Sequence, residues 1–394
     1  MIDTLPKTHK ADPMNEFQRI LDTALSRTNV VGAVAAVGSS DGITASAATG
    51  LADPATGKPM AMDSIFQVAS MTKAITTAAA LQLVERGSLA LDDPIGAVLP
   101  DLADPQVLTG FADDGTAQTR PAQTPITLRH LLTHTSGLGY SFTSGDMAKA
   151  QGEVVPASMN SLKSPLMFEP GSDWLYGVNT DWVGLAVEAA SGQTLAEYMA
   201  QHIFEPLGMD DTGFAVPPEK MERRVAMLST AEDGFAPFPI EIGGGDAAEF
   251  LSGGGGLYST APDYMRFMQM ILGKGTLGGA RVLSEENVAA MSTNQIGGLR
   301  AGKMESFVPV LANAFDPFPD MHSQWGLGFL INPEAGPNGR AAGSLTWAGI
   351  ANCYYWIDPV NDLAGMALMQ FLPFGDERAL GVLAAVEQSA YRAK

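Results

Sequence analysis

The sequence predicts an α+β fold in which a mostly antiparallel sheet, built from both ends of the chain, is flanked by terminal helices. Short β-like runs broken by turn residues occur near both termini, whereas helical segments and loops dominate between about residues 65 and 255. Such a pattern is most simply packed as one layered domain with a helical insertion. We therefore expect a discontinuous α/β domain from residues 1–64 and 256–394, and a mainly helical domain from residues 65–255.

The terminal elements follow from the spacing of apolar residues. Helical spacing predicts a first helix from about residue 14 to 27, and the strand-like runs 30–38 and 43–50 predict a hairpin. Near the other end, short strands are predicted within 325–331, 344–350, 352–358 and 363–371, followed by a terminal helix over 377–392. These runs supply the strands and the covering helices of the predicted sheet.

The central region carries helix signals and long loops. Apolar residues from Ile75 to Val84, closed by Gly87, predict an amphipathic helix that begins near Ser70. The capping box Thr194-Leu-Ala-Glu197 predicts the start of another helix. Two loop-like stretches, 103–125 and 300–322, are rich in Asp, Pro, Gly and Phe, and we expect them to rim a pocket.

Composition excludes several classes of partner. The chain has 394 residues, of which 23 are basic and 43 acidic, so its formal charge of −20 disfavours nucleic acid and anionic membranes. The single Cys353 cannot form an intrachain disulfide, and we expect a buried, inert thiol. Residues 1–17 lack the pattern of a secretory signal, and no run reaches the ~18 apolar residues of a membrane span, so a cytoplasmic protein is expected.

One serine motif is a decoy. Gly38-Ser39-Ser40-Asp41-Gly42 matches G-x-S-x-G, but the nucleophile elbow of that motif joins a strand to a helix. Here the pentapeptide joins two predicted strands. We interpret it as a hairpin turn, for which Ser-Asp-Gly is well suited.

Ser70 and Lys73 form the candidate catalytic pair. At a helix start, free backbone N–H groups and the positive end of the helix dipole would stabilise an oxyanion near Ser70. Positions i and i+3 share a helix face, so Lys73 can reach the serine oxygen. A cation in the first turn opposes the helix dipole, and burial there favours the neutral amine that a Ser/Lys nucleophile requires. The competing interpretation is a serine cap beside a solvated lysine, because S-x-x-K alone is a weak signal.

Five ordered blocks strengthen the catalytic interpretation. They are QVASMTKAITTAAALQLVERGSLALDDPI (67–95), ITLRHLLTHTSGL (126–138), DWLYGVNTDWVG around Tyr176, IFEPLGMDDTGF (203–214) and SGGGGLYSTAPDYMRFM (252–268). Together they resemble the class C-like branch of the serine β-lactamase and penicillin-binding-protein superfamily, and within it the family VIII carboxylesterases. The resemblance extends over about residues 14–390.

The resemblance implies a fold and a set of roles. It implies a β-lactamase/transpeptidase-like fold with the active site in the cleft between the two domains, Ser70 as the acylated nucleophile, Lys73 as its proton partner and Tyr176 as a proton shuttle. The oxyanion hole would be formed by the N–H groups of Ser70 and Ile350. The expected substrate-binding residues are Trp347, Gly349 and Tyr140.

The chain departs from the lactamase pattern in two motifs. The second motif of that family is Tyr-x-Asn, but here valine occupies the third position and Asn179 comes one residue late. The third motif is Trp347-Ala348-Gly349, which resembles the Trp-x-Gly of the esterases rather than a lysine-containing motif. The glycine is also expected to permit close approach of a ligand to the backbone.

We therefore expect a serine hydrolase that cleaves short-chain carboxylic esters, a small-molecule substrate class, without a cofactor or metal. Weak β-lactamase side activity is compatible with this function. The alternatives are a β-lactamase or D,D-peptidase-like enzyme, and a non-catalytic penicillin-binding-protein homologue. A Ser-His-Asp triad around His134 and a metal site are disfavoured, because no triad partner and no clustered Cys/His spacing is present. The sequence does not specify the oligomeric state.

Overall fold

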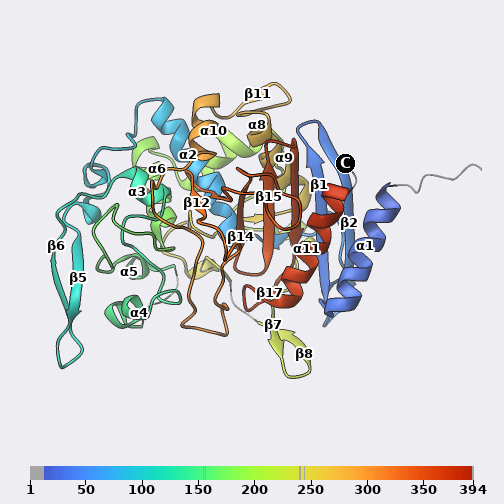
Figure 1. Ribbon diagram of the computed structural model, residues 1–394, viewed down its shortest axis with the longest axis horizontal. Helices are drawn as coiled ribbons and strands as arrows, with labels where there is room; N and C mark the ends of the chain where they lie inside the picture. Colours follow the sequence, from blue (N-terminus) through green and yellow to red (C-terminus); the bar gives the residue numbers. More distant parts are fainter. Residues whose placement is uncertain (1–12, 154, 156, 239–240, 244, 393–394) are drawn as a thin grey trace, which may run out of the picture.

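An eight-stranded sheet forms the centre of the computed structural model, which describes residues 13–392 except 154, 156, 239, 240 and 244 (Figure 1). Its strands are β1 (Gly32–Ser39), β2 (Gly42–Asp53), β3 (Lys58–Pro59), β12 (Gln324–Trp325), β13 (Leu330–Ile331), β14 (Leu345–Gly349), β15 (Cys353–Asp358) and β16 (Leu363–Leu368). They follow the order β12-β13-β14-β15-β16-β1-β2-β3, and all neighbours are antiparallel. The predicted antiparallel sheet with strands from both chain ends is confirmed.

Two terminal helices pack together on one face of this sheet. α1 (Pro13–Thr28) contacts β2 and α11 (Glu377–Arg392), and α11 contacts β16. Figure 1 shows the two helices side by side, with α9 (Ala261–Leu272) behind the sheet against β1 and β16. Phe17, Leu21 and Leu25 of α1 are buried, as the helical spacing predicts. Both predicted terminal helices are confirmed.

The serine of the G-x-S-x-G sequence, Ser40, lies in the turn of the β1–β2 hairpin and has a structural role. The turn between the two strands contains Ser40, whose hydroxyl donates to Asp362 Oδ2 at 2.9 Å and whose backbone N–H donates to Oδ1 at 3.1 Å. Both contacts hold the turn.

The strand predicted within residues 325–331 is not continuous in the structure. It is split into β12 and β13 by a turn in which Gly328 has φ +87°.

Helices and loops fill most of the region between residues 65 and 255. The helices are α2 (Thr72–Glu85), α3 (Leu128–Leu132), α4 (Gly145–Gln151), α5 (Met159–Leu162), α6 (Asn179–Ser191), α7 (Leu195–Met199) and α8 (Glu205–Leu207). The capping box of Thr194 and Glu197 is present at the start of α7. No observation tests the division into residues 1–64 with 256–394 and residues 65–255, so the division stays a prediction.

Helix α2 corrects one expectation. It ends just before Gly87, which has φ +72°, as the sequence predicts. However, every residue from Thr72 to Leu83 is buried, so α2 is a central helix rather than the expected amphipathic helix. Its alanines and threonines leave room for neighbours such as α6 and α7 on several sides.

The two long loop-like stretches differ in position. Residues 103–125 contain a hairpin of β5 (Gln106–Phe111) and β6 (Ala117–Pro121), which projects at the left edge of Figure 1. None of these residues lines the cavity described below, whereas residues 304–305 and 311–313 do. The expectation of a pocket rim is therefore wrong for 103–125 and right for 300–322.

Several short strands and one further helix lie outside the central sheet. They are β4 (Phe66–Gln67) with β9 (Tyr258–Ser259), β7 (Leu228–Ala231) with β8 (Gly234–Pro237) and β17 (Phe371–Leu372), β10 (Thr276–Leu277) with β11 (Ala280–Arg281), and α10 (Glu285–Met291).

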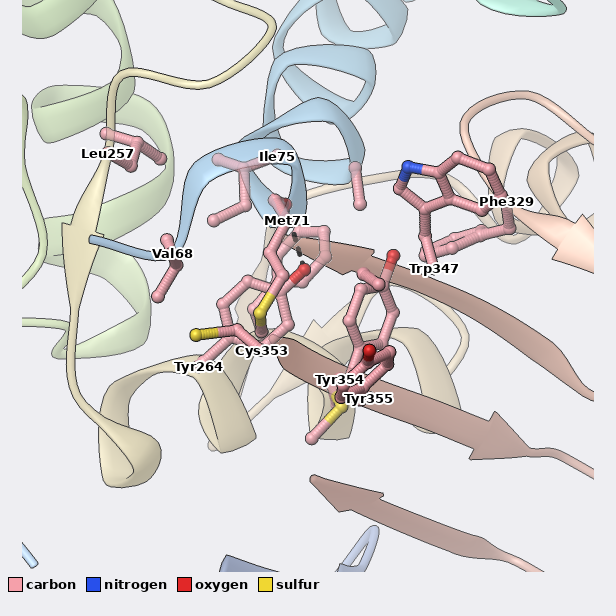
Figure 2. Close-up of a cluster of buried hydrophobic side chains, with 14 of the residues drawn as sticks. Val68, Met71, Ile75, Leu257, Tyr264, Phe329, Trp347, Cys353, Tyr354 and Tyr355 are labelled. Carbon is pink, nitrogen blue, oxygen red and sulfur yellow. Dashed lines mark hydrogen bonds between the residues drawn. The ribbon is translucent and has the colours of Figure 1, made fainter. Parts of the chain in front are cut away.

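A buried cluster lies beneath the start of α2. Figure 2 shows Met71 and Ile75 packed among side chains of the sheet and of α9, where the Tyr264 hydroxyl donates to the Met71 carbonyl at 2.9 Å. Cys353 lies in the same cluster, and burial raises the pKa of its thiol to about 12. The expected buried cysteine is confirmed. The cluster gives the segment around Ser70 a well-packed support.

Candidate active site

Ser70 lies in a single 3₁₀ turn, Ala69–Met71, that leads directly into α2. Ala69 has φ +45°, a conformation that residues other than glycine adopt rarely and that is often found at functional sites. Strand β14 approaches this turn closely, since a Cβ atom on Gly349 would lie 2.3 Å from the Val68 carbonyl oxygen. Gly349 therefore allows the close approach of the backbone before Ser70, and it is not among the residues that line the cavity described below. Its expected role in substrate binding stays a prediction.

Lys73 is almost completely buried, with 1% of its surface exposed. Its Nζ donates hydrogen bonds to Ser70 Oγ at 3.3 Å, to the Tyr140 hydroxyl at 3.1 Å and to the Gly254 carbonyl at 2.7 Å. These three acceptors match the three donors of an ammonium group. If the amine loses one proton, it can still donate to Tyr140 and Gly254 while its lone pair faces the serine hydroxyl.

Tyr140 is the phenol in direct contact with the lysine. Burial, the Asp181 carboxylate and the neighbouring Tyr176 raise the pKa of Tyr140 well above its usual value, so the phenol holds its proton. It also stacks on Phe142, with ring centroids 5.0 Å apart. The sequence predicted Tyr140 only as a substrate-binding residue, and its place beside Lys73 was missed.

Tyr176 faces the same lysine with its ring rather than its hydroxyl. Lys73 Nζ lies 4.7 Å from the centroid of the Tyr176 ring, a cation–π distance. The Tyr176 hydroxyl accepts a hydrogen bond from Trp347 Nε1 at 3.0 Å. Among the described residues, no hydrogen bond joins Tyr176 to Lys73. The structure thus connects the second motif to the third, through Tyr176 and Trp347.

A loop of glycines, residues 252–256, closes the site on the other side. The Gly253 carbonyl accepts from Thr76 Oγ1 at 2.7 Å, next to the bond between Gly254 and Lys73. Asp181 Oδ1 accepts from Ser252 Oγ at 2.6 Å and from the Gly254 N–H at 3.0 Å. The loop is thus hydrogen-bonded to both α2 and α6. Asp181 was not predicted.

His134 and Asn179 form a buried support and not a triad. Asn179 Nδ2 donates to His134 Nδ1 at 3.0 Å and to the Leu138 carbonyl at 3.0 Å. Burial first, and Lys73 second, lower the pKa of His134 well below its usual value. Asn179, which comes one residue late in the second motif, therefore uses its amide to hold the turn of residues 134–138. It does not line the cavity.

A cavity of about 360 Å³ opens beside Ser70. Of the expected site residues, Ser70, Tyr140, Tyr176, Trp347 and Ile350 line it. Most of its remaining surface is apolar, with contributions from Phe142, Leu162, Val178, Phe250, Met304, Leu311, Leu372 and Phe374. Its charged lining residues are acidic, namely Asp181, Glu241 and Glu305, and no arginine, lysine or histidine lines it among the described residues.

The described residues provide no metal centre and no membrane span. No group of three or more His, Cys, Asp or Glu side chains is placed to hold a metal ion within the described part of the chain. The helices described within residues 13–392 are all too short or too polar to cross a bilayer.

A Ser-x-x-Lys pair with a buried lysine, beside two tyrosines and at an apolar cavity between a sheet and a helical region, defines a serine enzyme of the β-lactamase type. The chain belongs to the beta-lactamase family, whose sequence profile matches residues 17–388. Within that family it is similar to esterases and acyltransferases.

Two curated relatives and one solved structure illustrate the similarity. Lovastatin esterase of Penicillium rubens is 33% identical over 330 residues, which covers 79% of this chain and 81% of the relative. Monacolin J acid methylbutanoyltransferase of Aspergillus terreus is 33% identical over 347 residues, 84% of this chain and 83% of the relative. A mutant simvastatin synthase from Aspergillus terreus superimposes with a TM-score of 0.83 at 29% identity, covering 97% of this chain and 95% of that one.

Proposed function

We propose that the protein hydrolyses short-chain carboxylic esters through an acyl-Ser70 intermediate, as the family VIII carboxylesterases do. The observation that carries this proposal is the contact of Ser70 Oγ with Lys73 Nζ at 3.3 Å, beside an apolar cavity that no cationic side chain lines among the described residues. The site thus combines an activated nucleophile with a pocket suited to neutral acyl groups.

In the acylation step, neutral Lys73 accepts the proton of Ser70 while the serine oxygen attacks the ester carbonyl carbon. The carbonyl oxygen becomes an oxyanion, which the backbone N–H groups of Ser70 and Ile350 would stabilise. The intermediate then collapses: the carbon–oxygen bond to the alcohol breaks, and the alcohol leaves with the proton held by Lys73. The product is an ester of Ser70.

In the deacylation step, a water molecule takes the place of the serine hydroxyl. The water gives a proton to Lys73, either directly or through the neighbouring phenols, and its oxygen attacks the acyl carbon. The bond to Ser70 Oγ breaks, the serine recovers its proton and the carboxylic acid leaves. Tyr140 contacts Lys73 directly, and Tyr176 lies between Lys73 and Trp347.

The lining of the cavity supports neutral substrates. Trp347 and Ala348 present an indole ring and a methyl group, and the charged lining residues among those described are acidic. A penicillin or a D-Ala-D-Ala peptide would bring its carboxylate to this surface, where it would lose hydration without a cationic partner, at a cost of several kcal/mol. We expect at most weak activity on some cephalosporins.

The test is a comparison of substrates on one preparation. We expect a higher kcat/KM for p-nitrophenyl acetate or butyrate than for nitrocefin or benzylpenicillin, and covalent labelling by a fluorophosphonate in the intact mass. Ser70→Ala should abolish the labelling and the turnover, whereas Ser40→Ala, in the hairpin turn, should retain both. Greater efficiency on benzylpenicillin, or labelling that persists in Ser70→Ala, would refute the proposal.

Acyl transfer to an alcohol is a second candidate. It is favoured by relatives named as methylbutanoyltransferases, which are 32–33% identical over 84% of this chain. Acyl-Ser70 would then be attacked by an alcohol in place of water. Addition of butanol to a p-nitrophenyl butyrate assay separates the two functions: a transferase yields mainly butyl butyrate, and a hydrolase yields mainly butyrate.

A further inference from the structure

A buried carboxylate lies behind the Ser/Lys pair, on a different helix. Asp181 is in the first turn of α6 and is only 4% exposed. Two groups of the glycine loop donate to its Oδ1, the Ser252 hydroxyl at 2.6 Å and the Gly254 N–H at 3.0 Å. No ion pair within 4.0 Å involves Asp181 among the described residues, although a buried carboxylate is costly without a charged partner.

Gly254 connects this carboxylate to the lysine. Its N–H donates to Asp181 and its carbonyl oxygen accepts from Lys73 Nζ at 2.7 Å, so the two charges lie on opposite sides of one residue. The fit leaves no room for a side chain, because a Cβ atom on Gly254 would lie 2.6 Å from Asp181 Oδ2. Any change that displaces Asp181 therefore displaces the carbonyl that holds Lys73.

The positions of Lys73 and Asp181 within their helices also favour an electrostatic pairing of the two residues. Lys73 lies in the first turn of α2, where the helix dipole disfavours a cation, and Asp181 lies in the first turn of α6, where the dipole favours an anion. The two helices pack against each other. The anion at the start of α6 thus offsets the unfavourable position of the cation at the start of α2.

We propose that Asp181 is a positioning residue of the proposed acyl-transfer site: it fixes the Gly254 carbonyl on Lys73 and supplies the negative charge that the lysine faces. This inference rests on the proposed function, because it concerns the activation of Ser70. Asp181 acts through Lys73 and not on the ester itself.

The charges around the pair determine the expected pH dependence. Burial raises the pKa of Asp181, and Lys73 opposes this effect. The titratable groups that face Lys73 are Tyr140, Tyr176, His134 and Asp181, whereas residues 252–256 carry none. Of these groups Asp181 brings a negative charge in its ionised form, since burial favours the neutral forms of Tyr140 and His134.

The experiment measures the rate of fluorophosphonate labelling of Ser70 as a function of pH, by intact mass. Asp181→Asn keeps the shape and an acceptor oxygen but removes the charge, so the ammonium form of Lys73 loses stabilisation. We expect the acidic limb of the rate profile to move to lower pH by about one unit, the size of a nearby charge effect. Asp181→Ser removes the same charge and should shift the limb in the same direction if the asparagine variant does not fold.

Glu188→Gln is the matched control, because Glu188 lies on the same helix and accepts from the Leu195 N–H, away from the cavity lining. It should leave the limb where the unsubstituted protein has it. An unshifted limb in a folded, labelled Asp181 variant would overturn the inference, and so would an equal shift in Glu188→Gln. Absence of labelling at Ser70 in the unsubstituted protein would instead refute the proposed function.

Discussion

The Trp347 indole N–H donates to the Tyr176 hydroxyl oxygen at 3.0 Å. The third motif therefore holds a tyrosine of the second motif, in addition to lining the cavity with an apolar ring. Because the phenol oxygen accepts this bond, its own proton stays available for a group in the site. The ring of Tyr176 in turn lies 4.8 Å from that of Trp347 between centroids.

Trp347→Phe should separate two roles of Trp347: the hydrogen bond that orients Tyr176 and the apolar contact with the substrate. Phenylalanine keeps an aromatic surface but cannot donate, so Tyr176 loses its fixed orientation. We expect kcat for p-nitrophenyl butyrate to fall on the order of 10-fold with a smaller change in KM, since one hydrogen bond is worth about 1 kcal/mol. Steady-state kinetics check this, and a change confined to KM would contradict it.

The two tyrosines should contribute to one proton path. Tyr140→Phe removes the hydroxyl that accepts from Lys73, and Tyr176→Phe removes the partner of Trp347. We expect each change, like Lys73→Ala, to lower kcat on the order of 10²-fold. A double variant that combines Lys73→Ala with either tyrosine change should be no slower than Lys73→Ala alone, because the groups act together. Additive losses, or an active Lys73→Ala protein at neutral pH, would contradict the Ser/Lys mechanism.

Gly349→Ala should displace the serine turn. The new methyl group would lie 2.3 Å from the Val68 carbonyl, so β14 and the segment before Ser70 must move apart. We expect a loss of about 1–3 kcal/mol in the free energy of unfolding, typical of overpacking, together with a loss of activity. Gly298→Ala is the control, because a Cβ atom there has no neighbour within 4 Å. Chemical denaturation and ester turnover of both variants provide the comparison.

His134 should make the protein sensitive to mild acid. Burial lowers its pKa well below the ordinary value, so the unfolded chain takes up a proton near pH 6.5 while the folded protein does not. Stability is therefore retained above pH 6.5 and lost as the pH falls below it, by up to about 1.4 kcal/mol per pH unit. Denaturation at pH 8, 6 and 5 measures this slope.

His134→Asn is the informative variant for that slope. Asparagine tolerates the φ of +57° at this position, although the loss of the ring should lower stability at pH 8. The slope below pH 6.5 should become flatter, with the parts due to His130 and His202 remaining, because burial lowers the pKa of both. His322→Asn, at an exposed position, is the matched control. An equal slope in His134→Asn would show that another group causes the acid sensitivity.

The spacing of apolar residues was sufficient to predict the elements at both ends of the chain. The terminal helix over residues 377–392 and the hairpin around Ser40 depend on local spacing and turn residues, which the sequence displays directly. The contact of Ser70 with Lys73 is likewise local, since the two residues share one helical turn. The burial of α2 on nearly all sides was not predicted, because it depends on neighbours that are distant in the sequence.

The missed part of the site consists of long-range contacts. The carbonyl of Gly254 and the phenol of Tyr140 meet Lys73 across 181 and 67 residues, and neither carries a signal of its role in the local sequence. Asp181 did offer one, because it is a single acidic residue at the start of the apolar segment Trp182–Val187. An acidic residue at such a position is either a cap or a buried functional group.

The shortest of the three lysine contacts is made by a backbone oxygen. A peptide carbonyl does not titrate, so the bond from Lys73 to Gly254 persists whichever of the surrounding side chains gains or loses a proton. Alanine scanning would pass over this group, because glycine has no side chain to remove. The amine thus has one fixed partner that cannot titrate, while its other two partners, Ser70 and Tyr140, are hydroxyl groups that can exchange protons.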